Sequence, residues 1–88
     1  MTKAAVVFAD GCEEVEGLSI IDVLRRLGVK ADMIGLTSKT INGDHNIKLT
    51  CDKIVDNSLL DYDLVAFPGG KTGAERLYRS RRVRYDRG

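Results

Sequence analysis

A strand–helix–strand pattern at the start of the chain most limits the folds open to it. Residues 4–9 (AAVVFA) are continuously apolar, which is typical of a parallel strand covered on both faces. Asp10 lies three residues before Glu13, a spacing that resembles a capping box at a helix start. The helix is predicted over residues 13–27 and a second strand over residues 29–36, with one glycine between them. Together these segments predict a βαβ unit with two parallel strands.

Smaller elements are expected after this unit. Asn42-Gly43 is a strong turn signal before residues 47–50 and predicts a small hairpin or an irregular excursion. Residues 56–60 are expected to form one helical turn, and residues 64–67 a buried strand. Residues 74–85 have helical character. The whole pattern is that of the opening half of an open α/β sheet.

Charge divides the chain into two parts. The 88 residues carry a net charge of +1, but residues 1–75 sum to −4 and residues 76–88, with six arginines, to +5. We therefore predict one small α/β domain over 1–75 and a basic, helical end over 76–88. Arginines interleaved with tyrosines can bind nucleic acid. A solvated helix end is the favoured interpretation, so nucleic acid is not an expected partner.

Targeting and cofactor signals are weak. No apolar run approaches the roughly 18 residues that cross a bilayer, and the short first run leads into acidic residues rather than a cleavage site. By elimination we expect a cytoplasmic protein without a membrane partner. His45 is the only histidine, and no cysteine lies at ligand spacing from it, so neither a metal site nor a cofactor is expected.

Glu16 is the first candidate for chemistry. The apolar face of the predicted helix is expected to hold Ile20, Val23, Leu24 and Leu27. The charged face is expected to hold Glu14, Asp22, Arg25 and Arg26. Glu16 falls on the apolar face, where a carboxylate costs free energy unless it is paired or protonated. Either it serves as a general acid/base at the edge of the sheet where ligands bind, or it complements the helix dipole.

The glycines after the predicted strand 64–67 are the second candidate. In the segment 67–73 (FPGGKTG), the glycines let the backbone turn and point N–H groups outward, where they can hold a developing oxyanion. A plain strand-to-helix turn is the alternative. A nucleotide-binding P-loop is not predicted, because Val65 stands where that motif requires a glycine.

The two cysteines each allow two interpretations. Cys12 follows Gly11 at a helix N-terminus, a setting that lowers the pKa of a thiol, so it is either redox-active or a small loop residue. Cys51 ends the predicted strand 47–50 and is either an oxidisable surface thiol or a passive residue.

In combination the motifs resemble the ThiJ/PfpI superfamily of flavodoxin-like α/β proteins, most closely its parkinsonism-linked deglycase branch. The matching segments, in order, are 6–16 (VVFADGCEEVE), 22–28 (DVLRRLG), 62–70 (YDLVAFPGG) and 73–77 (GAERL). The resemblance spans residues 3–80. It implies an open parallel sheet, of which this chain supplies the N-terminal half.

The resemblance also implies roles for individual residues. Glu16 matches the glutamate that hydrogen-bonds a nucleophilic cysteine and shuttles protons. Gly70 matches the glycine that offers an oxyanion N–H, and Gly69 and Gly11 belong to the pocket loops. Cys51 falls where some members carry a cysteine near the dimer interface. Such proteins are described as glyoxalases, deglycases, chaperones or redox sensors, and most are homodimers.

One part of the family pattern is absent. The nucleophilic cysteine of the family sits on a strand-to-helix elbow after the next strand, and a histidine follows it. The 88 residues end before both, and Cys12, Cys51 and His45 do not match these positions. The sequence therefore predicts a pocket half that is inactive alone and acts on small reactive carbonyls or glycated adducts only when completed. The alternative is a non-catalytic, dimerising interaction module.

Overall fold

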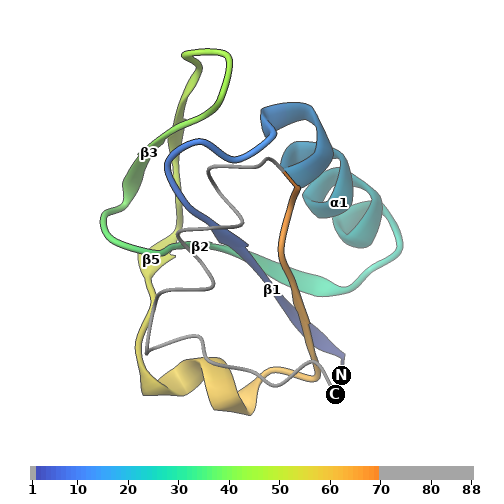
Figure 1. The fold of residues 1–88 in the computed structure, drawn as a ribbon. Helices are drawn as coiled ribbons and strands as arrows, with labels where there is room; N and C mark the ends of the chain where they lie inside the picture. The colour runs from blue at the N-terminus through green and yellow to red at the C-terminus, as the bar shows by residue number, and fades with distance from the viewer. Residues whose placement is uncertain (1, 70–88) are drawn as a thin grey trace.

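An open parallel sheet forms the centre of the computed structural model, which describes residues 2–69. Its strands lie in the order β5-β2-β1-β6, and all neighbours are parallel (Figure 1). The strands are β1 (Lys3–Phe8), β2 (Lys30–Gly35), β5 (Lys53–Ile54) and β6 (Leu64–Ala66). The register pairs Lys3 with Lys30 in β2, and Ala4 with Leu64 in β6. The predicted α/β class with a parallel sheet is confirmed.

The remaining elements also follow the sequence prediction. Helix α1 (Glu14–Arg26) joins β1 to β2, and Gly28 ends it with a φ of +82°, a conformation that favours glycine. The predicted hairpin is β3 (Thr40–Asn42) with β4 (Lys48–Thr50), and the helical turn is η1 (Asn57–Asp61). The predicted helix over 74–85 and the basic end over 76–88 lie outside the described residues.

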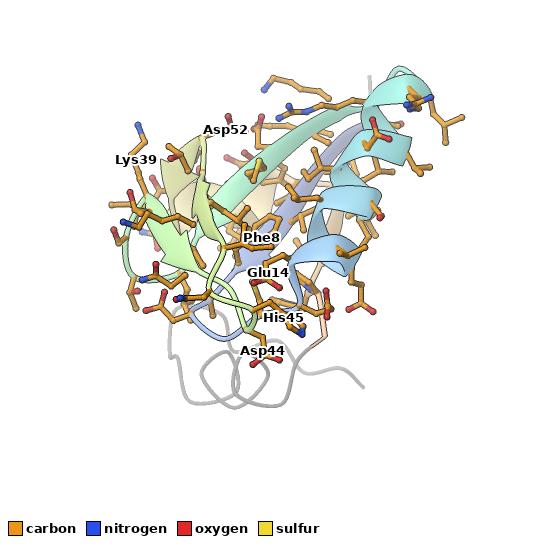
Figure 2. All side chains as sticks on the ribbon, turned by 90° about the horizontal axis from the view of Figure 1, so that it is seen from above. Phe8, Glu14, Lys39, Asp44, His45 and Asp52 are labelled. Carbon is orange, nitrogen blue, oxygen red and sulfur yellow. The ribbon has the colours of Figure 1, made fainter. Side chains whose placement is uncertain are left out.

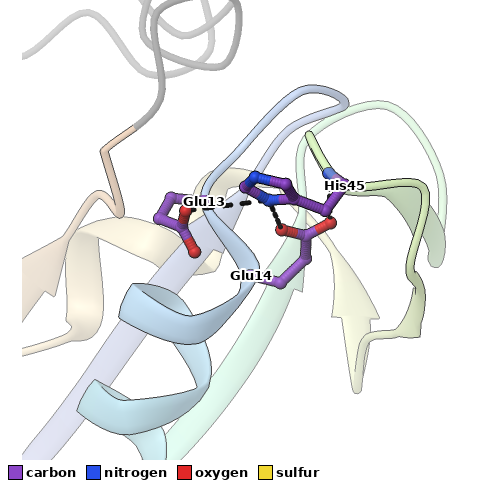
Figure 3. Close-up of side chains that lie close together, drawn as sticks. All are labelled: Glu13, Glu14 and His45. Atoms are coloured by element: carbon purple, nitrogen blue, oxygen red, sulfur yellow. Dashed lines mark hydrogen bonds and ion pairs between the residues drawn. The ribbon is translucent and has the colours of Figure 1, made fainter.

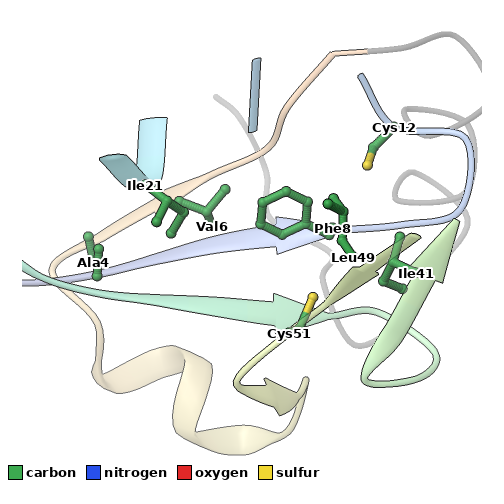
Figure 4. Close-up of a cluster of buried hydrophobic side chains, with 9 residues drawn as sticks. Ala4, Val6, Phe8, Cys12, Ile21, Ile41, Leu49 and Cys51 are labelled. Carbon is green, nitrogen blue, oxygen red and sulfur yellow. The ribbon is translucent and has the colours of Figure 1, made fainter. Parts of the chain in front are cut away.

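Strand β1 is buried on both faces because its side chains alternate between two apolar clusters. One cluster lies between the sheet and α1, and Figure 4 shows Ala4, Val6 and Phe8 of β1 in it together with Ile21 of the helix. The other cluster lies on the opposite face, where it includes Ala5, Val7, Ile34 and Leu59. This arrangement explains why residues 4–9 read as a continuous apolar run.

The start of α1 differs from the prediction. Glu13, not Asp10, is the N-cap residue, and its side chain accepts a hydrogen bond of 2.8 Å from the Val15 amide. Asp10 instead accepts one of 2.9 Å from the Asn42 amide in the hairpin. The reason is a turn at Gly11, closed by the Cys12 amide on Ala9, which moves the helix start beyond the reach of Asp10.

The predicted helix face is wrong in part: Ile20 and Leu24 pack against the core as expected, but other assignments differ. Glu14 is buried at 1% exposure, Glu16 is exposed, and Val23 and Leu27 are 52% and 72% exposed. The buried residues of α1 are Glu14, Gly17 and Ile21, which recur at helical spacing. The prediction counted only large apolar side chains, whereas the absence of a side chain at Gly17 lets the helix approach the Phe8 ring.

None of the helices within residues 2–69 has the length and apolar content needed to cross a bilayer.

Gly17→Ala is expected to lower the free energy of unfolding by about 1–3 kcal/mol, the range for overpacking a core. Its Cβ would overlap the buried Phe8 ring and lie 3.1 Å from Pro68 Cγ. Urea unfolding followed by circular dichroism measures the change. Ser19→Ala, at an exposed position of the same helix, is the control and should cost nothing. Equal stability of the two variants would contradict this packing.

Candidate functional site

The loop after β6 is tied to the first turn of α1 by two hydrogen bonds. The Gly69 amide donates to Glu16 Oε1, and the Glu13 amide donates to the Gly69 carbonyl at 2.8 Å. Both segments follow the carboxyl ends of the neighbouring strands β1 and β6, the edge where open α/β sheets bind ligands. The structure thus brings Glu16 and Gly69 together at this edge of the sheet. Gly70 lies outside the described residues.

Gly69 can approach Glu16 because it has no side chain. A Cβ at this position would lie 2.8 Å from Glu16 Oε1, inside van der Waals contact. Within residues 2–69, Oε1 is the Glu16 oxygen that has a hydrogen-bond partner. An exposed carboxylate fixed through one oxygen is suited to accept or release a proton at the other.

A second carboxylate, Glu14, forms a contact that the sequence did not predict. Glu14 lies under the β3–β4 hairpin, as Figure 2 shows, and both of its oxygens face the hairpin tip. Its Oε1 lies 3.0 Å from His45 Nδ1, while Oε2 accepts from the amides of His45 at 2.7 Å and Ile47 at 3.4 Å. The sequence feature that could have indicated its burial is the spacing of Glu14 and Gly17, which lie three residues apart on the buried face of α1.

The electrostatics of this pair follow from its hydrogen bonds. Burial raises the pKa of Glu14, but the bonds from His45 and from backbone amides outweigh burial and lower it to about 2. The pKa of His45 is raised, chiefly by its hydrogen bond to Glu14 and then by the charges of Glu14, Glu13 and Asp44. The carboxylate and the protonated imidazole therefore stabilise each other.

Glu13 completes a small cluster with this pair (Figure 3). Its Oε2 lies 3.8 Å from His45 Nδ1, and ligand-type atoms of Glu13, Glu14 and His45 all lie within 4.8 Å of one another. A metal would have to displace the hydrogen bonds that already occupy both Glu14 oxygens. We therefore interpret the cluster as an ion pair and not as a metal centre.

The Gly11 loop is held by the same hairpin. The Gly11 amide donates to the Asn42 carbonyl at 2.8 Å, and Gly11 has a φ of +88°, which favours glycine. At the hairpin tip, Gly43 leaves the space that the Glu14 side chain occupies. A pocket role for Gly11 stays a prediction.

The cysteines lie in the core and not on a surface. Cys12 is 0% and Cys51 3% exposed, both are free thiols, and both belong to the cluster in Figure 4. Burial raises the pKa of Cys12, which overturns the expectation that the helix N-terminus lowers it. Burial, with the charge of Asp52 and the proximity of Cys12, raises the pKa of Cys51 to about 11. The interpretation of Cys51 as a surface thiol is therefore wrong.

Fold and site define an α/β protein of flavodoxin-like topology whose sheet edge carries a fixed carboxylate. The model of the DJ-1/PfpI family matches residues 2–85, and the chain belongs to this family. The resemblance predicted from the sequence motifs is thereby confirmed.

Two individual relatives also support the family assignment. The chain is 32% identical over 85 residues to the Danio rerio protein named Parkinson disease protein 7 homolog, covering 93% of this chain and 45% of that protein. It is 36% identical over 85 residues to protein dj-1beta of Drosophila melanogaster, and the match covers 88% of this chain and 43% of that protein. The chain thus spans less than half the length of these relatives.

Solved structures agree in fold. The crystal structure of Drosophila melanogaster DJ-1beta superposes with a TM-score of 0.89 at 31% identity, over 93% of this chain and 45% of that one. Oxidised Toxoplasma gondii DJ-1 gives a TM-score of 0.88 at 32% identity, and the match covers 94% of this chain and 46% of that one. The described residues therefore have the arrangement of the corresponding part of these structures.

Both thiols are expected to react slowly with a disulfide reagent such as DTNB at pH 8 in the folded protein. Burial blocks access, and the raised pKa values leave little thiolate at this pH. Absorbance of the released thiolate measures the rate, and the same protein in guanidinium chloride should release two equivalents quickly. Fast reaction of either thiol in the folded protein would contradict the buried placement.

Proposed function

We propose that the chain supplies the proton-handling half of a pocket that acts on small reactive carbonyls or their glycated adducts. The observation that carries this proposal is the hydrogen bond between Glu16 and the Gly69 amide at the carboxyl edge of the sheet. Family membership supports it, because Glu16 matches the family glutamate that is paired with a nucleophilic cysteine.

In the proposed reaction, the thiol of the family's elbow cysteine attacks the carbonyl carbon. A carbon–sulfur bond forms, the thiol proton passes to the Glu16 carboxylate, and the carbonyl oxygen becomes an oxyanion. The Gly70 amide holds that oxyanion, with Gly69 and Gly11 lining the pocket. The hydrogen bond from Gly69 fixes the rotamer of Glu16 and keeps one of its oxygens directed at the pocket.

The nucleophile is the part that this chain does not match. Cys12 and Cys51 are buried on the α1 face of the sheet and are not at the elbow position of the family. We therefore propose that the 88 residues alone are inactive and that a further segment supplies the elbow cysteine. Residues 1–75 form the pocket half in this proposal, 76–88 a basic end, and the setting is cytoplasmic.

A second candidate function is a non-catalytic module that associates with itself. Large apolar side chains on the outside of α1 favour it: Val15 is 69% exposed and Leu18, three residues later on the same face, is 39% exposed. Burying them against a second copy would remove apolar surface from water.

The catalytic proposal is tested with methylglyoxal. The purified chain should not consume it, whereas a chimera that joins residues 1–69 to the remaining part of the Drosophila relative should. Glu16→Gln in the chimera should lower kcat/KM by about 10²–10⁴-fold, the range for a lost general acid/base. Asp22→Asn, on the exposed side of the same helix, is the matched control. A folded chimera whose rate is unaffected by Glu16→Gln would overturn the proposed role.

The association proposal is tested by light scattering. The chain should scatter as a species heavier than 9.7 kDa, and the double substitution Val15→Ser with Leu18→Ser should return it to the monomer mass. Leu60→Ser changes an equally exposed residue of η1, on the other face of the sheet, and should leave association intact. Scattering of the unaltered chain as a monomer would refute self-association.

A further inference from the structure

We propose that the tip of the β3–β4 hairpin is a pH-dependent latch on the first turn of α1, closed by His45 against Glu14. The latch rests on contacts within residues 10–47 and does not depend on the proposed reaction. Its tests read structure and protonation, so that its failure is distinguishable from failure of the catalytic proposal.

The latch has one buried and one accessible partner. The Glu14 side chain is 2% exposed, whereas the His45 side chain is 65% exposed and can exchange protons with solvent. Their closest atoms, Glu14 Oε1 and His45 Nδ1, are 3.0 Å apart, and the other Glu14 oxygen accepts the amides of His45 and Ile47. A single carboxylate thus binds both the side chain and the backbone of the hairpin tip.

Two further carboxylates, Glu13 and Asp44, favour the protonated form of His45. Glu13 from the helix start and Asp44 from the hairpin raise the pKa of His45, and Asp10 and Cys12 lie in the loop that the hairpin covers. Among residues 2–69, no lysine or arginine forms an ion pair with Glu13, Glu14 or Asp44. The surroundings therefore favour a protonated imidazole.

The remaining hairpin contacts persist through mildly acidic and neutral pH. The Asp44 amide donates to the Cys12 carbonyl at 2.8 Å, and the Gly11 amide donates to Asn42 at 2.8 Å. Backbone amides and carbonyls do not titrate in this range, so these contacts do not change with pH. His45 is thus the group whose charge changes as the pH moves between 6 and 8.

The direction of the effect follows from the two pKa shifts. The pKa of His45 is raised in the folded state, so its stabilisation is complete below its ordinary value of 6.5 and is lost as the pH rises through the raised value. The pKa of Glu14 is lowered, so its stabilisation is complete above 4.5 and is lost as the pH falls toward about 2. The latch is tightest between about pH 4.5 and 6.5.

The latch acts on the turn that carries Glu16. Glu14 and Glu16 both belong to the first turn of α1. Just before this turn, the Gly11 amide donates to the Asn42 carbonyl of the hairpin, and the amide of the N-cap residue Glu13 donates to the Gly69 carbonyl. Mild acidification should therefore hold the hairpin, the Gly11 loop and the start of α1 together, and alkaline pH should release the tip first.

The protonation of the latch is measured by proton NMR. Because the chain has one histidine, its imidazole signal is assigned without ambiguity. The signal of the unaltered protein should titrate above 6.5, and that of Glu14→Gln should return toward 6.5. Asp22→Asn, which removes a charge from the exposed side of α1, should leave the titration unchanged. Titration of the unaltered protein at or below 6.5 would overturn the proposal.

Opening of the latch is measured by amide hydrogen exchange, as protection factors corrected for intrinsic exchange. Protection of the His45 and Ile47 amides should fall between pH 6 and 8, by up to about tenfold for each unit by which the His45 pKa exceeds its ordinary value. His45→Gln, at an exposed position that leaves the core intact, should abolish this dependence. Protection that is independent of pH in the unaltered protein, or equally dependent in His45→Gln, would refute the latch.

Discussion

Burial of β1 on all sides is the constraint on which the rest of the structure depends. A parallel strand hydrogen-bonds to β1 on each edge, and an apolar cluster covers each face. A strand in this position cannot present a polar side chain without leaving it unpaired, so residues 4–9 are apolar throughout. The first polar group therefore appears directly after this apolar run, at Asp10, and the candidate site residues Glu16 and Gly69 lie at that edge of the sheet.

The turn after β1 gathers three contacts into a short stretch of chain. Asp10 and Gly11 bind the hairpin, Glu13 binds the Gly69 loop, and Glu14 binds His45. Each contact joins segments that are distant in sequence. Together the contacts hold the start of α1, and with it Glu16, in position. The hairpin thus serves as a support for the helix start as well as a cover for the core.

Local patterns predicted β1, α1, β2 and the hairpin because each of these elements has a local cause, whereas the two-residue strand β5 was not predicted. The apolar run of β1, the glycine after α1 and the Asn42-Gly43 turn all depend on neighbouring residues and were interpreted correctly. The sheet edge at which Glu16 lies was also predictable, because parallel strands end at one edge. These features together fix the fold class and the location of the candidate site.

Long-range contacts explain the errors. The orientation of α1 depends on the approach of Gly17 to Phe8, which a count of large apolar residues does not contain. The burial of Glu14 depends on amides supplied by a hairpin some 30 residues later in the chain, and helical periodicity contains no information about these amides. The burial of Cys51 likewise depends on the packing between sheet and helix, and its sequence neighbours do not indicate it.

The hydrogen bond from Gly69 to Glu16 has a consequence for the conformational entropy of the Glu16 side chain. A long exposed glutamate side chain ordinarily samples many rotamers, and ordering it in one of them costs about 1.5–2 kcal/mol of entropy. Here the folding of the sheet edge has already ordered it, since the Gly69 amide selects one rotamer before any ligand arrives. A change in the loop after β6 would therefore alter the rotamer freedom of Glu16 without altering the helix that carries it.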